Sequence, residues 1–252
     1  SGDWSGQLLS IPIGPTGIVS TSEWNAGSVS LSPSVINPAS RIMITKGSSD
    51  GIAFQYGNLT TAQKAFIDKN AAGTVDNCGA ERIAYLRGTA TQESSSGTFT
   101  CASSTTINKF RVRSTSKLGD IVNSGPMFVG KPTAGYSDVD HSGYAAFKNN
   151  YKDRIPMVYV GANDGILHGF NACIVGVTPG CTTADAGKEL LAYIPSHVYE
   201  NLSRLTDKDY NASHRYFADG SPMVGDVYSS GTSSWRTILV GGLNGGGQGF
   251  YA

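Results

Sequence analysis

Acidic and small polar side chains between Asp138 and Gly143 are spaced like the start of a calcium-binding loop. Carboxylates occupy positions 1 and 3 and glycine occupies position 6, the order in which an EF-hand loop wraps oxygen ligands around Ca²⁺. Position 12 is Asn149, whereas such a loop needs a bidentate glutamate there. The pattern therefore predicts Asp138, Asp140 and Ser142 as a weak calcium site, with a solvated loop as the alternative.

The four cysteines favour disulfide bonds over metal binding. Counting alone allows three sets of pairings, and the two local pairs are Cys78 with Cys101 and Cys173 with Cys181. Neither spacing matches the Cys-x-x-Cys pairs of zinc sites. Disulfides would imply an oxidising compartment, and free thiols are the alternative.

Other segments contain residue types used in catalysis or ligand binding but lack the required context. Ser221, His214 and Asp219 are the types of a hydrolase triad, yet they lie close together in one segment and have no Gly-x-Ser-x-Gly elbow. The glycine-rich run 241–249 leads into a strand, whereas a phosphate loop leads into a helix. His168 alternates with apolar neighbours, so we interpret it as a hydrogen-bonded residue of a sheet rather than a ligand.

Composition excludes several classes of function. Lysine plus arginine and aspartate plus glutamate both total 19, so no general electrostatic attraction toward nucleic acid is expected. No apolar run approaches the ~20 residues of a membrane helix. We also find no basic-then-apolar leader, and expect the chain to be a processed or excised piece of a longer protein. The 32 glycines favour an all-β fold with many tight turns.

Two hairpins are the strongest local elements. Met157–Gly161 reads as a strand, Asn163-Asp164-Gly165 as a tight turn, and Ile166–Phe170 as the returning strand. A second hairpin covers Trp235–Ala252, and aligning Gly165 with Gly245 also aligns Gly161 with Gly241 and Phe170 with Phe250. Recurrence of one unit indicates a repeat architecture.

The repeat extends upstream, because a small residue, Pro-Met and a Val-Gly strand precede each hairpin, at Pro126 and at Pro222. The first copy carries an additional polar, Tyr-rich segment, 131–153, and loops tolerate such insertions. Three or four antiparallel strands per unit predict β-propeller blades, with a β-sandwich as the main alternative. We expect binding residues in 131–153 and 94–106, because insertions on rigid blades are where binding surfaces diversify.

Local patterns predict further elements. They are a strand, turn and strand over 6–24, a hairpin over 41–56, a helix over 61–70 that Asn58 or Thr60 caps and that buries Ala62, Ala65 and Phe66, a helical turn or strand over 80–88, a strand at Lys109–Arg113, a strand ending at Pro195, and a short helix that Ser196 caps and that buries Val198, Leu202 and Leu205.

Taken together, five ordered motifs resemble the C-terminal β-propeller of the PilC/PilY family of type IV pilus tip-associated proteins. They are Leu118-Gly-Asp-Ile-Val-Asn-Ser-Gly-Pro126, Val158-Tyr-Val-Gly-Ala-Asn-Asp-Gly-Ile-Leu-His-Gly-Phe170, Leu191-Ala-Tyr-Ile-Pro-Ser196, His214-Arg-Tyr-Phe-Ala-Asp-Gly-Ser-Pro222 and Trp235-Arg-Thr-Ile-Leu-Val-Gly-Gly-Leu243. The resemblance implies an all-β, quinoprotein-like propeller, seven-bladed in the parent protein, with short helices in inter-blade insertions. Residues 1–252 would form its first blades, with the remainder after Ala252, and the strands over 6–24 would join C-terminal strands to close the ring.

The resemblance also implies a function. It predicts a non-enzymatic pilus biogenesis factor and tip adhesin, with roles in surface attachment, twitching motility and control of pilus extension and retraction. Its partners would be minor pilins and host or abiotic surfaces. It would lie outside a Gram-negative cell, at the pilus tip or outer surface, after passage through the periplasm, with calcium possible in the parent chain. The alternatives are a periplasmic quinoprotein-like redox enzyme using pyrroloquinoline quinone, which the absence of adjacent cysteines disfavours, and a propeller that only scaffolds partners.

Overall fold

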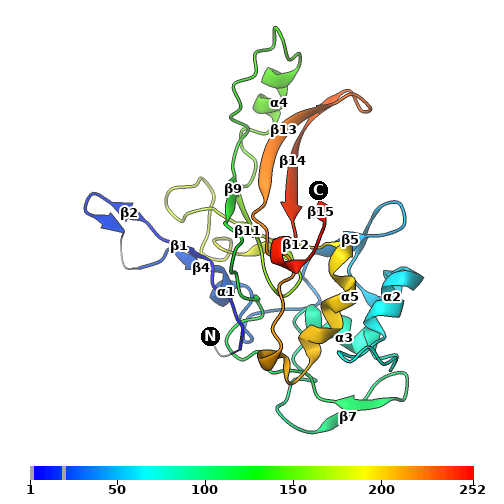
Figure 1. Ribbon diagram of the computed structural model, residues 1–252. Coiled ribbons are helices and arrows are strands. Elements are labelled where there is room, and N and C mark those ends of the chain that lie inside the picture. The colour runs from blue at the N-terminus through cyan, green and yellow to red at the C-terminus, as the bar shows by residue number, and fades with distance from the viewer. Residues whose placement is uncertain (1–2, 19–20) are drawn as a thin grey trace.

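The first repeat unit forms a four-stranded antiparallel meander in the computed structural model, which describes residues 3–18 and 21–252 (Figure 1). Its strands are β9 (Met127–Val129), β10 (Met157–Gly161), β11 (Leu167–Asn171) and β12 (Glu189–Ile194). The predicted tight turn joins β10 to β11, with Gly165 at a φ of 86°. Strands paired in chain order form one blade, as the repeat predicts.

The second repeat unit contains β13 (Met223–Ser229), β14 (Ser234–Gly242) and β15 (Phe250–Tyr251), again antiparallel and in chain order. The 3₁₀ turn η5 (Asn244–Gly246) joins the second strand to the third, the same place that Gly165 takes in the first blade. The glycine-rich run is therefore a turn into a strand, as predicted. Two successive blades with equivalent corners fit an incomplete propeller, and the described sheets do not close into a ring.

Equivalent residues of the two blades contact each other where β9 and β13 begin. Asn123 donates to the Asp219 carboxylate from its backbone N and from Nδ2, at 3.2 and 2.8 Å. The Ser124 hydroxyl donates to the Gly220 carbonyl at 3.1 Å, and the Gly125 N–H donates to Ser221 Oγ at 2.7 Å. Each bond joins residues 96 positions apart, the spacing that also separates the two Pro-Met motifs. Equivalent positions of the two neighbouring blades are thus hydrogen-bonded to each other just before their first strands.

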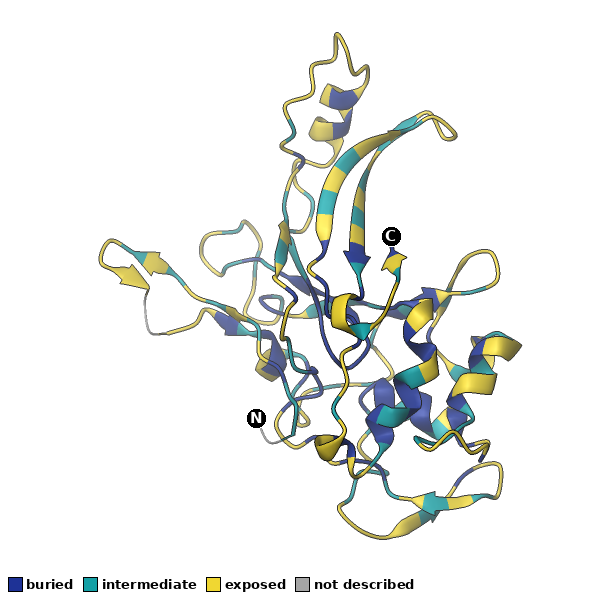
Figure 2. Cartoon of the chain, in the orientation of Figure 1, coloured by how far each residue is buried: buried dark blue, intermediate teal, exposed yellow. Residues whose placement is uncertain are grey.

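The predicted hairpin over 41–56 enlarges the first blade. It forms β5 (Met43–Lys46) and β6 (Gly51–Ala53), and β5 pairs in parallel with β12. The blade therefore becomes a six-stranded sheet in the order β6-β5-β12-β11-β10-β9. Within this sheet, β11 is buried along its whole length (Figure 2).

Short helices cover one side of this sheet, at the lower right of Figure 1. They are α2 (Thr61–Ile67), α3 (Gly79–Leu86), α5 (Tyr199–Leu202) and the 3₁₀ turns η1 (Tyr56–Asn58), η2 (Ser196–Val198), η3 (Ser203–Thr206) and η4 (Tyr210–Ala212). Val198, Leu202 and Leu205 are buried in the main hydrophobic cluster, which confirms their prediction. None of the described helices has the length and apolar character needed to cross a bilayer.

Thr60 caps α2 with a complete capping box, one of the two caps predicted, but the predicted buried face is wrong. Ala62, Ala65 and Phe66 are exposed, while Gln63 and Ile67 are buried. Gln63 is drawn inward because its side chain donates to the Lys46 carbonyl at 2.8 Å.

Two further local predictions are wrong. Lys109–Arg113 is not a strand: only Phe110 makes an isolated bridge, and the regular strand lies upstream. Arg111 and Arg113 are buried and Val112 is exposed, because Arg113 pairs with Glu93 at 2.6 Å. Ser196 lies inside η2 rather than at its cap, and it makes no capping hydrogen bond.

The segment over 6–24 is a projecting two-stranded ribbon, at the far left of Figure 1. It contains β1 (Leu9–Ser10), β2 (Ile13–Gly14), β3 (Gly17–Ile18) and β4 (Trp24–Asn25), followed by α1 (Ala26–Val29). Part of the predicted second strand, 19–20, lies outside the described residues. Ile13 and Ile18 are 83% and 77% exposed. Its predicted pairing with C-terminal strands stays a prediction.

Both local cysteine pairs are disulfides in the structure. Cys78–Cys101 ties the start of α3 to the exposed hairpin of β7 (Thr98–Thr100) and β8 (Thr106–Asn108). Cys173–Cys181 closes the loop that follows β11.

Candidate binding groove

The insertion 131–153 between β9 and β10 forms an arm that projects beyond the blades, at the top of Figure 1. It contains the helix α4 (Tyr144–Asn150), whose N-cap Gly143 has a φ of 82°. Most of the arm is exposed (Figure 2), but Tyr144 and Phe147 are buried. An arm with its own buried side chains is an ordered element and not a free loop.

The arm leaves the first blade but packs on the second. The Tyr144 hydroxyl donates to Asp226 Oδ2 in β13 at 2.7 Å, and Trp235 Nε1 in β14 donates to the Ser142 carbonyl at 3.0 Å. The Trp235 ring stacks on Tyr136 with centroids 5.3 Å apart and meets the Tyr144 ring edge-on at 4.8 Å. These contacts connect two blades through side chains that are distant in sequence.

The tyrosine at this junction remains a neutral donor. Burial, together with the Asp226 carboxylate that accepts its hydrogen bond, raises the pKa of Tyr144 to about 12. Asp226 also accepts from Thr237 Oγ1 at 2.7 Å. Both carboxylate oxygens are therefore occupied, and this acid is part of the arm's attachment.

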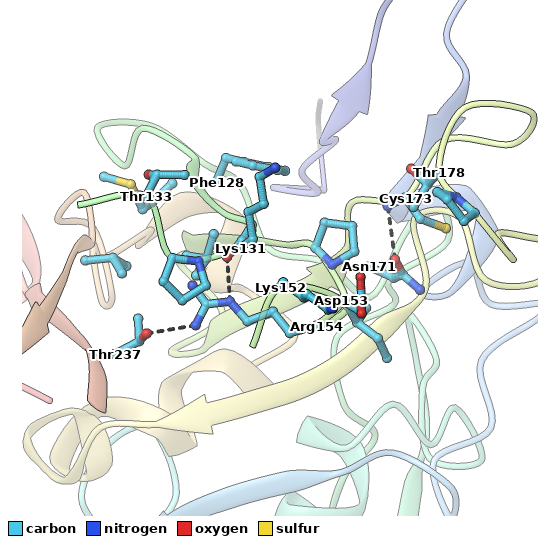
Figure 3. A pocket seen from close by; sticks show the side chains of 18 of the residues that line it. Phe128, Lys131, Thr133, Lys152, Asp153, Arg154, Asn171, Cys173, Thr178 and Thr237 are labelled. Atoms are coloured by element: carbon cyan, nitrogen blue, oxygen red, sulfur yellow. Dashed lines mark hydrogen bonds between the residues drawn. The ribbon is translucent and has the colours of Figure 1, made fainter. Parts of the chain in front are cut away.

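A groove of about 1030 Å³ opens beneath the arm, between β9, β13 and the Cys173–Cys181 loop (Figure 3). It is large enough for a ligand of the size that protein pockets usually hold. Its lining combines apolar side chains with charged ones, and includes Phe128, which is 63% exposed.

Arg154 holds one wall of the groove in place. Its Nε donates to the Gly130 carbonyl after β9, and its Nη1 donates to Thr237 Oγ1 in β14 at 2.8 Å (Figure 3). On the opposite side, Asn171 Oδ1 accepts from the Cys173 N–H at 3.0 Å and orients the disulfide loop. The groove is therefore bounded by fixed elements of both blades.

Six charged side chains line the groove, and three of them have defined partners. Arg154 and Asp226 are occupied as described above, and Asp185 accepts hydrogen bonds from Thr182, which lower the pKa of its carboxyl. Lys131, Lys152 and Asp153 make no ion pair or hydrogen bond with any described residue, and all three are exposed. A ligand in the groove would therefore meet two unpaired cationic side chains and one unpaired anionic side chain.

The predicted calcium residues lie on an exposed turn of the arm. Asp138 Oδ1 accepts from the Ala145 N–H at 2.7 Å, so this carboxylate organises the entry into α4. Asp140 and Ser142 are exposed, and the Ser142 carbonyl is used by Trp235. Calcium binding there stays a prediction. Among the described residues one group of possible ligands does converge, Cys78, Glu81 and Cys101, but its cysteines are joined in a disulfide.

The residues of the rejected triad do not assemble. His214 Nε2 contacts Asp120 at 3.0 Å and stacks on Trp4, with centroids 3.8 Å apart. Asp219 binds Asn123 and Ser221 accepts from the Gly125 N–H, as described for the blade junction. Each of the three serves a different structural contact.

Sequence reasoning treated His168 as a singly placed residue, whereas it lies in a buried ionic chain. Its Nδ1 lies 2.7 Å from Glu189 Oε1 and its Nε2 lies 3.0 Å from Asp164 Oδ2. Arg41 holds Glu189 in a bidentate pair at 2.6 and 2.8 Å. Asp164 Oδ2 in turn accepts from the Gly119 N–H at 2.9 Å. Histidine in an alternating strand was the available signal; Asp164 lies four residues before it in the same hairpin, but Glu189 and the Arg41 that holds Glu189 come from distant segments.

The carboxylates of this ionic network keep the buried histidine charged. Burial lowers the pKa of His168, but the Asp164 and Glu189 carboxylates raise it more, to about 9. Burial raises the pKa of Glu189, but Arg41 and His168 lower it more, to about 2. The network therefore carries two cations and two anions at neutral pH, and its geometry is that of a structural ion chain fixing the β10–β11 corner.

Comparison with known proteins identifies relatives along the whole chain. The family model for the PilY1 beta-propeller domain matches residues 118–252. The type IV pilus biogenesis factor PilY1 of Pseudomonas aeruginosa strain PAK is 34% identical over 260 residues, which cover 99% of this chain and 20% of that protein. A PilY1 homolog of Xylella fastidiosa strain Temecula1 is 34% identical over 257 residues, covering 100% and 17%. The chain thus spans about a fifth of the length of the curated relatives it matches.

Among solved structures, the crystal structure of the Pseudomonas aeruginosa PilY1 C-terminal domain is similar over 49% of this chain and 21% of that one. The sequence identity is 35% and the TM-score is 0.32.

Proposed function

The chain belongs to the PilY1 β-propeller family, and from this premise we propose that it acts as part of a type IV pilus biogenesis factor. The observation that carries the proposal is the family match over 118–252, which contains β9 to β15, the arm and the groove. The names of the relatives at 34% identity support the same role.

Within that role, we propose that the groove and arm contact partners at the pilus tip. Two blades fix the walls of the groove, and ligand-binding residues are commonly carried by insertions on such rigid scaffolds. The exposed β7–β8 hairpin, which overlaps 94–106, offers a second surface, held by Cys78–Cys101. Minor pilins and the surfaces that the cell attaches to are the proposed partners, and the cell surface or pilus tip is the proposed location, reached through the periplasm.

We propose no catalytic role for this stretch. Ser221, His214 and Asp219 are each bound elsewhere, which supports a binding function rather than hydrolysis. Of the three tryptophans that a quinone site would draw on, Trp24 is buried in a core cluster and Trp235 holds the arm. Calcium at Asp138, Asp140 and Ser142 belongs to the proposal as a regulator of the arm.

The test replaces the chromosomal gene in a piliated host by variants of the full-length protein. Deleting the gene should remove surface pili and twitching; normal piliation would reject the biogenesis role. Lys131→Glu combined with Lys152→Glu should leave the secreted protein folded but lower pilus number and recovery of minor pilins in a pull-down. Lys46→Glu, at the exposed end of β5 and outside both the groove and the arm, is the control and should behave as wild type. Equal behaviour of both variants would reject the groove as the contact site.

A further inference from the structure

The groove is bordered by two strand edges, and the hydrogen-bonding register tells which backbone groups face it. In β14, Gly242 O accepts from Gly220 N and Leu243 N donates to Gly249 O. Even-numbered residues of β14 therefore bond toward β13, which places Met223, Gly225 and Val227 of β13 opposite them. Backbone polar groups alternate sides along a strand. The N–H and C=O groups of Val224 and Asp226 therefore point away from β14.

The edge of β13 is open at these two residues. β13 is the terminal strand of its sheet, and both Val224 and Asp226 line the groove. Their backbone groups have no hydrogen-bond partner among the described residues. An unpaired row of alternating donors and acceptors is a template for another extended chain.

The edge of β9 on the other side of the groove is short and is blocked on either side of Phe128. The same reasoning applies: Ala162 N donates to Ile166 O, so even residues of β10 bond to β11 and odd residues bond to β9. The backbone polar groups of Phe128 therefore point away from β10, as do those of Pro126 and Gly130, two positions away on either side. Pro126 has no N–H, and the Gly130 carbonyl is occupied by Arg154. Proline and short length are common ways of blocking an edge strand.

We propose that β13 accepts an extended, acidic segment of a partner polypeptide as an added strand within the groove. An extended chain fits the unpaired backbone groups of Val224 and Asp226. The free Lys131 and Lys152 side chains outnumber the free Asp153 carboxylate, so they favour carboxylates on the segment over cationic side chains. The inference rests on the proposed function, because it names the chemistry by which that same groove would bind a partner. Because the contact uses the backbone groups of Val224 and Asp226, it does not depend on most of the segment's side chains. Contacts with the two lysines add selectivity.

Proline substitution separates this mode from ordinary groove binding. Val224→Pro removes an N–H that faces the groove and leaves the β13–β14 ladder intact, since proline is tolerated where the N–H of an edge strand faces outward. Val224→Ala keeps the N–H and is the matched control. Gly225→Pro removes a ladder bond to β14 and serves as the folding control, expected to lower the melting temperature where Val224→Pro does not.

The experiment measures fluorescence anisotropy of labelled nine-residue peptides with the full-length protein. The first, acidic peptide has glutamate at every second position and valine or threonine between. The second peptide has lysine in place of each glutamate. The third is the acidic peptide with every second backbone amide N-methylated. We expect the acidic peptide to bind, Val224→Pro to weaken it about tenfold, the loss of roughly one backbone hydrogen bond, and N-methylation to abolish it. Val224→Ala should bind within about twofold of wild type, and the lysine peptide should bind at least about tenfold more weakly.

Three results would overturn the inference: no binding of the acidic peptide, equal binding by Val224→Pro and wild type, or equal binding of the N-methylated peptide. Stronger binding of the lysine peptide would overturn the acidic assignment. None of these results bears on pilus biogenesis, because that role is scored separately by surface pili in the gene-deleted host. If gene deletion removes the pili but the acidic peptide does not bind the purified protein, the proposed function stands and only strand addition is rejected.

Discussion

Replacing His168 by glutamine removes the central charge of the buried chain and provides a test of the network. The imidazolium lies between Asp164 at 3.0 Å and Glu189 at 2.7 Å and is fully buried. Glutamine keeps a hydrogen-bonding side chain of similar reach but cannot carry the positive charge. His168→Gln therefore leaves two carboxylates facing a single cation, Arg41.

The expected size follows from the difference in pKa between the folded and unfolded states. The folded pKa of His168 is about 9, against 6.5 when it is unperturbed. A raised pKa stabilises the fold fully below the unfolded value and loses that effect as pH rises through the folded value. At about 1.4 kcal/mol per pKa unit, protonation of His168 contributes roughly 3 kcal/mol below pH 6.5, which disappears above pH 9.

Urea unfolding of wild type and His168→Gln between pH 6 and 10 measures this contribution as the difference in the free energy of unfolding. We expect that difference to be largest near pH 6 and to shrink by roughly 3 kcal/mol by pH 10. Nitrogen-15 NMR of the imidazole gives the folded pKa independently. A pH-independent difference, or an imidazole that titrates below 6.5, would refute the charged network.

Three further outcomes are expected. Gly161→Ala places a Cβ 2.0 Å from the Ala218 carbonyl oxygen and should lower the free energy of unfolding by about 3 kcal/mol. The control Gly225→Ala, whose Cβ meets no atom within 4 Å, should change that free energy little. Equal urea midpoints for the two variants would contradict this. Tyr144→Phe should lose about 1–2 kcal/mol of arm attachment to Asp226 and speed limited proteolysis within 131–153, unlike Tyr151→Phe at a side chain 48% exposed. Ca²⁺ titration calorimetry should give millimolar-range binding that Asp138→Asn with Asp140→Asn abolishes, and identical heats would reject the site.

Short-range chemistry made much of this fold predictable. Asn163-Asp164-Gly165 predicts the β10–β11 turn because glycine accepts the positive φ found at position 165. The repeated Pro-Met and Gly pattern predicts two blades in equivalent registers, and the hydrogen bonds between residues 96 apart are its direct consequence. In these cases the information lies within a few residues of the feature.

Long-range pairing explains what sequence reasoning missed. The alternation of Lys109–Arg113 favours a strand with its valine inward, but Arg113 instead lies over the Tyr85 ring at 3.5 Å and pairs with Glu93. Val112 is exposed as a result. The arm was expected to be a loop, since nothing within 131–153 reveals that Trp235 receives it. Each error arises where a charged or aromatic side chain finds a partner that local periodicity cannot register.

The groove's shape depends on contacts at both of its ends. At one end, the bonds from Asn123 to Asp219 and from Gly125 to Ser221 fix the starts of β9 and β13 relative to each other. At the other end, the arm bridges the blades through Tyr144 and Asp226. A cleft held at both ends has little freedom to close when empty, so a ligand does not have to supply the free energy of ordering its walls. Weakening either attachment should therefore reduce binding in the groove without altering any residue that touches the ligand.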